Sequence, residues 1–546
     1  MTIWQLKVVG GRAKPLKLGD DPLTIGRHPD NRLRLTDERA SRHHCVIERQ
    51  NGHYVLKDLG SRNGTKLNGV AVTGENPLKA GDRIEIGAVA MIVEQREAVA
   101  AGDADDPRAK GRKGEAATAR GGPWVQEIEG ILQAFAGQIQ HPDEQLQILD
   151  ANGRASSAIM NDSDGPRALR LLLRCANRTA GTDIHIEPKG DCVNVRMRVD
   201  GQMVYICELT PQAGSLCMGM VKAACQMGVA GTEAIQEGHF SCRFPDRRVE
   251  YRVSFTPSVY GQKLVIRVLD QRGVPTSLSD LNLAPYMHER IRQVCTQDSG
   301  LLLVCGPTGS GKTTTLYNGL REIDRDARNV ITIEDPVEYQ LEGVTQIPID
   351  EKRGNTFHSL LRSVLRQDPD VILLGEIRDE DTARTAMQAA MTGHLVFSTV
   401  HSKDTIAAVF RLLDLKVEPY LVANSLNLVL AQRLVRKLCP HCKQEVAVTP
   451  AQATRMGKYL GGKTKIFSAT GCRRCLKTGY HGRIALFELL DVNDDLRDVI
   501  LNQPTIQAMK KIIEGGLFTT LAQSGWRLVA EGVTSLDEVD RIAVQS

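Results

Sequence analysis

Residues 306–313, GPTGSGKT, constrain the fold of this 546-residue chain more than any other stretch. They match the pattern G-x-x-x-x-G-K-[ST], follow the apolar run LLLVC and precede a segment with helical spacing. Glycines let backbone amides surround phosphates, Lys312 reaches the β- and γ-phosphate oxygens, and Thr313 offers a hydroxyl to Mg²⁺. The alternative, a glycine turn without a ligand, does not explain the flanking strand and helix. We therefore expect ATP and Mg²⁺ to bind at Gly306, Pro307, Thr308, Gly309, Ser310, Gly311, Lys312, Thr313 and Thr314.

Strand-like and helix-like segments alternate on both sides of this loop, from residue 276 to residue 435. The apolar runs NVITIED, DVILLGEI and GHLVFSTVH are separated by segments with helical spacing. This order predicts a mostly parallel sheet covered by helices, in which ligands bind at the carboxyl ends of the strands.

Acidic residues follow two of these runs. Glu334, Asp335 and Glu338 lie at the end of ITIEDPVEY, and Glu376 ends VILLGE. A carboxylate at this edge can polarise an attacking water or order Mg²⁺, and the alternative is a set of surface carboxylates. We predict that Glu338 activates the water, that Glu376 orders Mg²⁺, and that the other two contact ATP. Gly375 stands where many P-loop enzymes have Asp, which disfavours direct carboxylate coordination of the metal there.

Two histidines flank the strand-like segment LVFSTV. His394 precedes it and His401 follows it. A lone histidine is more often structural than catalytic, but this pair occurs in the right order for a sensor of the γ-phosphate. We predict that His394 contacts the nucleotide and that His401 takes part in catalysis.

Taken in order, these motifs resemble those of the type II secretion and type IV pilus assembly ATPases. The resemblance covers about residues 165–546 and includes TDIHIEP and RMRVDG upstream and TGYHGR and LFELL downstream. It implies a homohexameric cytoplasmic motor that hydrolyses ATP to power assembly of a type IV pilus or a type II secretion pseudopilus. It also implies contacts with the inner-membrane platform proteins of such a machine.

The same resemblance implies that an N-terminal subdomain places arginines on the nucleotide. Arg196, Arg198 and Arg252 are the candidates, because an additional cation stabilises charge on the transferring phosphate. Arginines on an ordinary strand surface are the alternative. The segment QEGHF departs from the family, since His239 stands where an arginine is usual.

The 13 cysteines fall into two classes. Nine are scattered, often in apolar segments, and are expected to be small buried hydrophobic residues in a reducing compartment. Two CxxC pairs separated by 29 residues suit a structural zinc site better than a redox pair, with His441 as a rival ligand. The predicted ligands are Cys439, Cys442, Cys472 and Cys475. Related retraction motors generally lack this knuckle, so by resemblance it favours assembly or secretion.

The first 97 residues have a different pattern: short runs rich in Val and Ile are punctuated by glycine turns, which predicts an all-β sandwich. Its turns carry TIGRHPDN, ERASRHHCVI and DLGSRNGT, which resemble forkhead-associated (FHA) domains that bind phosphothreonine peptides. Arg27 and Arg42 would pair with the phosphate, Ser41 would donate to it, and Asn63 would hold the peptide backbone. His44 is expected to brace the loop from within. A sandwich kept only as a docking surface is the alternative.

The patterns divide the chain into seven parts. They are an FHA domain (1–97), a flexible linker (98–123), a helical adaptor (124–164), a PAS-like α/β subdomain (165–275), a RecA-like core (276–435), a zinc knuckle (436–485) and a helical C-terminal region (486–546). A net charge of +4 gives no argument for direct nucleic-acid binding. The apolar runs are too short to span a bilayer and the N-terminus lacks the order of a signal peptide. We therefore expect a cytoplasmic protein that reaches the inner membrane through partners.

The combination predicts a motor that is recruited or regulated by a phosphothreonine-containing protein. The alternative from another class is a phosphopeptide-binding scaffold with a weak or inactive nucleotide site, against which the intact Lys312, Thr313 and His401 argue. A retraction motor is a third interpretation. Pilus assembly, secretion and DNA uptake all stay open as the process served.

Overall fold

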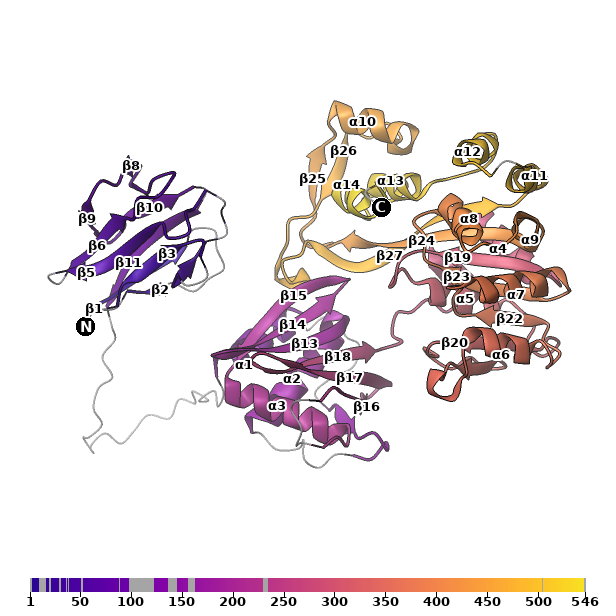
Figure 1. Cartoon of the computed structure of the whole chain (residues 1–546), viewed down its shortest axis with the longest axis horizontal. Coiled ribbons are helices and arrows are strands. Elements are labelled where there is room, and N and C mark those ends of the chain that lie inside the picture. Colours follow the sequence, from indigo (N-terminus) through magenta and orange to yellow (C-terminus); the bar gives the residue numbers. More distant parts are fainter. Residues whose placement is uncertain are drawn as a thin grey trace. The chain divides into compact units, whose positions relative to one another are not determined.

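The structure is a computed structural model of the whole chain, and it divides into two compact units, Met1–Ala117 and Thr118–Ser546 (Figure 1). Almost all of the predicted linker 98–123 lies outside the residues that it describes. The described residues are 2–8, 16–18, 21–28, 31–35, 37, 39–50, 53–87, 89–97, 122–135, 145–155, 163–228, 234–502 and 504–544.

The first unit is a sandwich of two sheets, which confirms the predicted all-β fold. One sheet has the strand order β2-β1-β11-β10-β7-β8 and the other β4-β3-β5-β6-β9. Alternate side chains face inward, among them Leu6, Ile25, Leu56, Ile84 and Met91, and form a core of their own. The described strands are β1 (Thr2–Val8), β2 (Leu16–Lys17), β3 (Leu23–Gly26), β4 (Leu33–Arg34), β5 (Cys45–Gln50), β6 (His53–Asp58), β7 (Lys66–Leu67), β8 (Val70–Ala71), β9 (Glu75–Pro77), β10 (Arg83–Ile86) and β11 (Val89–Glu97).

The second unit begins with an antiparallel sheet in the order β12-β16-β17-β18-β13-β14-β15. Three helices pack on one face of it, α1 (Pro123–Ala134), α2 (Asp164–Thr179) and α3 (Pro211–Ala224) (Figure 1). In β14 every second residue is buried, so Arg196 and Arg198 lie on the face away from these helices. The strands are β12 (Gln147–Leu149), β13 (Gly181–Lys189), β14 (Cys192–Val199), β15 (Gln202–Leu209), β16 (Gln236–Arg243), β17 (Arg248–Ser258) and β18 (Gly261–Leu269).

The predicted helical adaptor 124–164 differs from the structure. Its helix, α1, ends at Ala134, and Gln147–Leu149 form an edge strand of the sheet. Trp124 and Ile128 of α1 are buried in the same core as the sheet. Helical spacing identified α1, but strand pairing with residues about a hundred positions away decides where β12 lies.

A mostly parallel sheet follows, in the order β21-β20-β22-β23-β19-β24-β27, and it confirms the predicted core. Only β27 pairs antiparallel, with β24, among the pairings described in this sheet. Strands such as β19 and β23 are buried at every residue because helices cover both faces. The elements are α4 (Pro285–Cys295), β19 (Gly300–Cys305), α5 (Lys312–Arg321), β20 (Val330–Glu334), β21 (Thr345–Pro348), α6 (Phe357–Val364), β22 (Val371–Leu374), α7 (Glu380–Met391), β23 (Leu395–Val400), α8 (Thr405–Asp414), α9 (Pro419–Ser425), β24 (Leu426–Leu438) and β27 (Tyr480–Asp491).

The remaining elements form a small hairpin module and a helical end. The hairpin packs against the last helices through a cluster that includes Met456, Ile466, Val529 and Val539. None of the described helices is both long and apolar enough to cross a bilayer. The elements are β25 (Gln444–Ala447), α10 (Pro450–Met456), β26 (Lys465–Ser468), α11 (Asp494–Asn502), α12 (Ile506–Glu514), α13 (Leu521–Ala530) and α14 (Leu536–Val539).

Candidate functional site

The parallel sheet brings several predicted site residues to one edge. Strands β19, β22 and β23 run in the same direction and in register, with Cys305 beside Val400. The phosphate-binding loop therefore leaves the sheet at the same edge as the segments that carry Glu376 and His401. Ligands of open α/β sheets bind at this carboxyl edge.

The loop at 306–311 has the backbone that a phosphate cradle requires. Gly306, Gly309 and Gly311 have φ values of 154°, 77° and 89°, which side chains with a Cβ rarely adopt. The Oγ atom of Ser310 is buried and has no hydrogen-bond partner among the described residues. A buried hydroxyl without a partner costs free energy, so this atom fits a loop that is completed by a ligand.

The ammonium of Lys312 lies across the loop. It donates to the carbonyl oxygens of Gly306 at 2.9 Å and Pro307 at 3.2 Å. Burial lowers the pKa of Lys312 from its ordinary value, and the carboxylate of Glu376 acts in the opposite direction. Thr313 and Thr314 are half-buried in the first turn of α5, whose positive end favours an anion.

Glu376 is the centre of a charged cluster beside the loop. Its Oε2 lies 3.4 Å from Nε2 of His401, and it forms an ion pair with Arg378. Arg378 also lies 3.9 Å from a carboxylate oxygen of Asp335, so the ends of β20, β22 and β23 are joined. Arg378 was not predicted from sequence, although its position in GEIRD, two residues after Glu376, was a usable signal. The cluster can order a metal ion and hold a protonated or neutral histidine near a phosphate.

Two predicted carboxylates near the end of β20 differ in their surroundings. Glu334 is buried and accepts hydrogen bonds from Tyr317, from Thr332 at 2.6 Å and from Gln346 at 3.1 Å. Its carboxylate is thus engaged inside the core of the protein. Glu338 is exposed on the segment that follows β20.

The structure does not bring His394 to this edge. His394 precedes β23, whereas His401 follows it, so they are separated by the length of a six-residue strand. That length is about 20 Å at ~3.3 Å per residue. The Nδ1 atom of His394 lies 3.1 Å from the carbonyl oxygen of Ala389, in the last turn of α7. Seven-residue spacing places both histidines at strand ends, but at opposite ends.

Arg196 and Arg198 are engaged on the open face of the first sheet of the second unit. Arg196 donates to Glu187 at 2.9 and 3.1 Å, and Arg198 lies 3.6 Å from Asp183. Burial alone would raise the pKa of Glu187, but hydrogen bonds from Arg196 and Lys263 lower it to about 2. Both arginines are partly exposed, and they lie two residues apart on the same face of β14.

Arg252 differs from these two because it contacts the domain that holds the phosphate loop. Its Nη2 donates to the carbonyl oxygen of Val337 at 3.4 Å, next to Glu338. His239, which stands where the family has arginine, is exposed and pairs directly opposite Arg252 in the ladder of β16 and β17. The two predicted family positions are therefore neighbours.

In the first unit, hydrogen bonds tie together the three turns predicted to bind phosphopeptide. The backbone N–H of Ser41 donates to Nδ1 of His44 at 2.9 Å, and Nε2 of His44 lies 3.3 Å from the carbonyl oxygen of Gly64. The backbone N–H of Arg62 donates to Oγ of Ser41 at 3.0 Å, and that of Arg27 to its carbonyl at 2.9 Å. His44 is fully buried and braces the loops from within.

Arg27 and Arg42 present their side chains to solvent. Both are exposed, and no hydrogen bond or ion pair engages either guanidinium within the described residues. Asn63 is also exposed, and its side-chain amide donates to the carbonyl oxygen of Arg39 at 2.8 Å. Two exposed guanidinium groups beside the Ser41 hydroxyl can pair with a dianionic phosphate.

Comparisons with known proteins agree with the predictions for both the ATPase part and the FHA domain. The model of the family described as type II/IV secretion system protein matches residues 162–541, and that of the FHA domain matches residues 23–87. The chain belongs to the type II/IV secretion system protein family. It is 41% identical over 383 residues to the type II secretion system protein E of Pectobacterium carotovorum, covering 70% of this chain and 76% of that one. It is 38% identical to the type II secretion system ATPase E of Vibrio cholerae, with 71% and 77% covered.

Family membership confirms the prediction of an ATPase, and the second match confirms the FHA domain. Among solved structures, the chain is similar to the ATPase DotB of Legionella pneumophila, with a TM-score of 0.53 and 21% identity. That similarity covers 71% of this chain and 99% of the other, and it bears on the fold alone.

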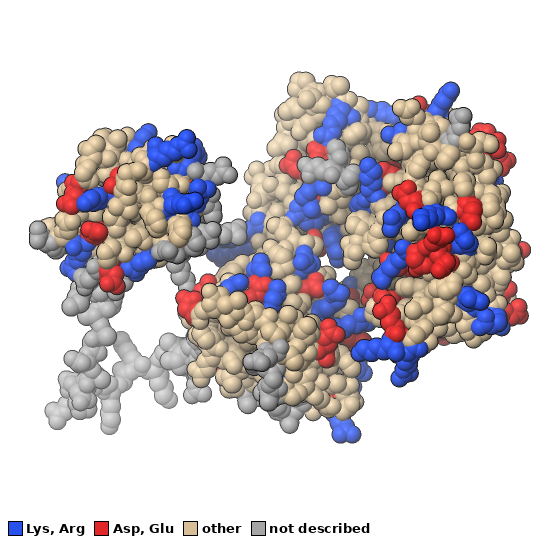
Figure 2. Space-filling view, viewed as in Figure 1, with Lys and Arg blue, Asp and Glu red and all other residues tan. Residues whose placement is uncertain are grey.

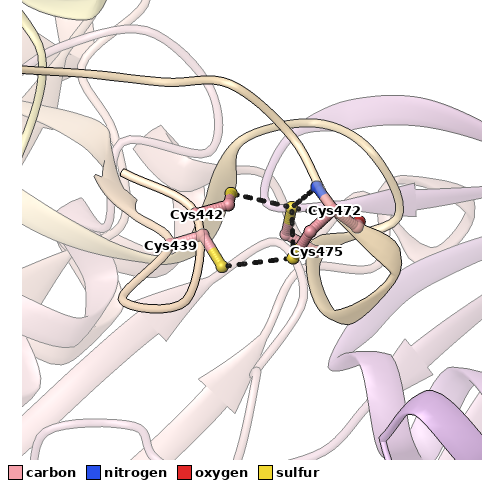
Figure 3. A group of neighbouring side chains, drawn as sticks. All are labelled: Cys439, Cys442, Cys472 and Cys475. Carbon is pink, nitrogen blue, oxygen red and sulfur yellow. Dashed lines mark hydrogen bonds between the residues drawn. The ribbon is translucent and has the colours of Figure 1, made fainter. Parts of the chain in front are cut away.

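The two CxxC pairs of this family member meet in space. Two loops present them to one another, and all four sulfur atoms lie within 4.8 Å of each other (Figure 3). The Sγ atoms of Cys439 and Cys472 are 3.9 Å apart, and those of Cys442 and Cys475 are 3.8 Å apart. Four thiol groups around one point suit tetrahedral zinc. His441 is exposed and lies 3.2 Å from Arg474, so the structure does not place this rival ligand in the cluster.

The nine other cysteines behave largely as predicted. Eight are buried and Cys192 is half-buried. Burial raises the pKa of Cys175 and Cys217 to about 12, which keeps these thiols protonated and unreactive.

A cavity of about 550 Å³ adjoins the phosphate loop at 307–310. Its other walls are the turn at 200–203, residues of β24 and β27, and the segment 538–542. None of these residues was predicted from sequence to lie beside the loop, because residues 100 or more positions away leave no local signal. The charged ones are Asp200, Arg433, Arg436, Arg483, Glu538 and Arg541.

Proposed function

We propose that the chain is a cytoplasmic, homohexameric motor that hydrolyses ATP to drive assembly of a type IV pilus or a type II secretion pseudopilus. The observation that carries this proposal is the convergence of the phosphate loop, Glu376 and His401 on one sheet edge. That edge lies within the region matched by the secretion family model. The motor would act on inner-membrane platform proteins of the machine and reach the membrane through them.

Each residue at this edge has a role in the proposed reaction. Loop amides and Lys312 would bind the β- and γ-phosphates, and the Thr313 hydroxyl would hold Mg²⁺, which neutralises phosphate charge when bound. Glu376 would order the metal's water ligands, and His401, held by Glu376, would sense the γ-phosphate. Glu338 would orient and deprotonate the attacking water.

The arginines would stabilise the transferring phosphate. Arg252 supports this proposal because it already contacts the segment that carries Glu338. Arg196 and Arg198 face away from the covering helices, where a neighbouring subunit of a ring could be reached. Their present partners, Glu187 and Asp183, keep the guanidinium groups oriented.

We further propose that the FHA domain binds a phosphothreonine-containing protein and thereby recruits or regulates the motor. The linked turns and the exposed Arg27 and Arg42 support this role. The same geometry supports the alternative of a phosphopeptide scaffold with an inactive nucleotide site. The two differ in whether the ATPase is needed for the cellular process.

A complementation experiment tests the motor proposal. Cells that lack the chain should regain pilus or pseudopilus assembly with the wild type but not with Lys312→Ala at equal protein level. Restoration by Lys312→Ala would contradict the motor and favour the scaffold. Surface pili that still assemble in cells lacking the chain, but no longer retract, would identify a retraction motor instead.

Two ligands complete the proposal. We propose one structural Zn²⁺ at Cys439, Cys442, Cys472 and Cys475, where it would join the hairpin module to the core. ATP with Mg²⁺ is the substrate at the phosphate loop.

Basic and acidic side chains are interspersed over the face of the second unit in Figure 2, in keeping with the small net charge of the chain.

A further inference from the structure

Arg433 is a buried cation whose hydrogen bonds do not neutralise it. It lies on β24 and is 5% exposed. Its Nη2 donates to the carbonyl oxygen of Lys403 at 2.6 Å, and its Nη1 donates to the carbonyl oxygen of Gln432 at 3.1 Å. Both acceptors are neutral, and no ion pair engages Arg433 within the described residues.

Two carboxylates act on Arg433 electrostatically, but both are engaged elsewhere. Asp404 caps α8, accepting a hydrogen bond from the backbone N–H of Ala407 at 2.7 Å. Glu488 accepts from the backbone N–H of Thr405 at 2.9 Å and from that of Leu521 at 3.2 Å. The positive ends of α8 and α13 therefore balance these charges. Burial lowers the pKa of Arg433 in spite of the two carboxylates.

The other arginines that line the same cavity are compensated. Arg436 and Arg541 share the buried carboxylate of Glu538, at 2.7 Å each. Arg483 lies 3.9 Å from Asp200. Arg433 differs from all three, although it is among the most buried cations at this cavity.

The position of Arg433 in the cavity indicates which anionic ligand could offset its positive charge. It lines the cavity together with residues 307–310 of the phosphate loop. A methyl group added to Gly306 would lie 3.1 Å from its Nη1, so the guanidinium is directly beside the start of the loop. An uncompensated buried cation is costly, and that cost is removed when an anion binds next to it.

We propose that Arg433 is a nucleotide-binding residue, whose guanidinium pairs with a phosphate oxygen of the nucleotide held by the loop. The inference rests on the proposed nucleotide site. It adds a second phosphate-binding cation, Arg433 on β24, to the one that Lys312 supplies. The Lys403 carbonyl holds one end of the guanidinium, so the group is oriented before the ligand arrives, and little ordering is lost on binding. Because Lys403 follows His401 by two residues, the same contact joins the phosphate loop to the histidine segment.

Nucleotide affinity of the full chain tests this role. Dissociation constants for Mg²⁺·ADP and for a non-hydrolysable ATP analogue would be measured for wild type, Arg433→Gln, Arg433→Lys and a control, Arg328→Gln. A charge-assisted hydrogen bond predicts that Arg433→Gln weakens binding of at least one nucleotide about tenfold to hundredfold. Arg328 is a matched control, because it donates to the Gln297 carbonyl at 2.8 Å but has its own carboxylate, Asp298, at the opposite sheet edge. Its variant should bind both nucleotides within about twofold of wild type.

The thermal midpoint without nucleotide separates binding from a structural role. Loss of an uncompensated cation should leave this midpoint nearly unchanged in Arg433→Gln, while the rise on adding Mg²⁺·ADP shrinks. Wild-type dissociation constants for both nucleotides would overturn the inference. If Arg433→Gln does not fold, Arg433→Lys decides: weaker binding supports the role, and unchanged binding overturns it. Wild-type affinity in Lys312→Ala would instead contradict the nucleotide site itself.

Discussion

At the scale of single residues, the site depends on which end of a strand a side chain follows. Lys312, Glu376 and His401 all leave their strands at the carboxyl edge, whereas His394 enters β23 at the other edge. Glu334 is one residue before Asp335, yet its carboxylate is taken up inside the core. Residue type and spacing found the motifs, but direction within the sheet decides which members can share a ligand.

The two histidines give a matched pair of variants. His401→Ala should lower kcat about a hundredfold or more, as expected for a group at the reacting phosphate, and leave nucleotide affinity within a few fold. His394→Ala should keep kcat within about twofold of wild type, because its ring lies at the opposite edge. Steady-state ATPase kinetics of both variants measure this. Equal losses in the two variants would show that the strand direction does not separate their roles.

Glu187 gives a pH-dependent prediction. Its pKa in the folded protein is about 2, below the ordinary value of 4.5, because Arg196 and Lys263 bind its charged form. A depressed folded pKa means that the stabilisation is present above about pH 4.5 and is lost as pH falls toward 2. Glu187→Gln should therefore lower the thermal midpoint at pH 7, and the difference from wild type should shrink below about pH 4.5. A difference that grows on acidification would contradict the ion-pair assignment.

At the scale of elements, the hairpin module depends on the cysteine cluster. Two CxxC turns hold β25, β26 and α10 beside the core, and a small apolar cluster joins them to α13 and α14. So few buried side chains supply little stability without a cross-link or a metal.

Removal of one ligand tests the metal. Cys472→Ser should reduce bound zinc from about one per chain toward zero and make the module sensitive to proteolysis, because tetrahedral coordination needs all four thiolates. Cys192→Ser, a half-buried cysteine outside the cluster, is the control and should keep its zinc. Metal analysis of the purified chains measures both. Full zinc content in Cys472→Ser would contradict the four-cysteine site.

Prediction from sequence succeeded for these elements where the signal was local. The phosphate loop, the buried parallel strands, the CxxC turns and the FHA turns each carry their information within about ten residues. The rest depended on distant pairing: β12 joins a sheet through Cys242, and Glu538 compensates Arg436 from more than a hundred positions away. No periodicity within one segment reports such contacts, so Arg433 and the end of α1 were not predicted.

At the scale of the whole molecule, the chain joins two units with separate cores. The FHA sandwich buries its own apolar side chains, and the secretion-family part buries others. Separate cores predict that each unit keeps its fold without the other. The FHA domain would then act on the ATPase part through a partner or through the covalent connection between the two units.

Removal of residues 1–97 tests this division of labour. The shortened chain should hydrolyse ATP with a kcat within about twofold of the full chain in the absence of partner, because no residue of the proposed catalytic site is lost. Binding of a phosphothreonine peptide should disappear, as it should in the full chain with Arg42→Ala. Fluorescence anisotropy and ATPase assays measure these outcomes. A shortened chain that fails to hydrolyse ATP would mean that the first unit is part of the motor itself.

The most direct test of the account is steady-state phosphate release by the purified full chain with Mg²⁺·ATP, beside Lys312→Ala and His394→Ala. We predict turnover by wild type and by His394→Ala, and loss of at least two orders of magnitude in Lys312→Ala, because the Lys312 ammonium is the cation proposed to bind the β- and γ-phosphates. Melting curves without nucleotide would establish that all three chains are folded. Absence of phosphate release by the folded wild type, or equal release by Lys312→Ala, would contradict the assignment of this sheet edge as the ATPase site.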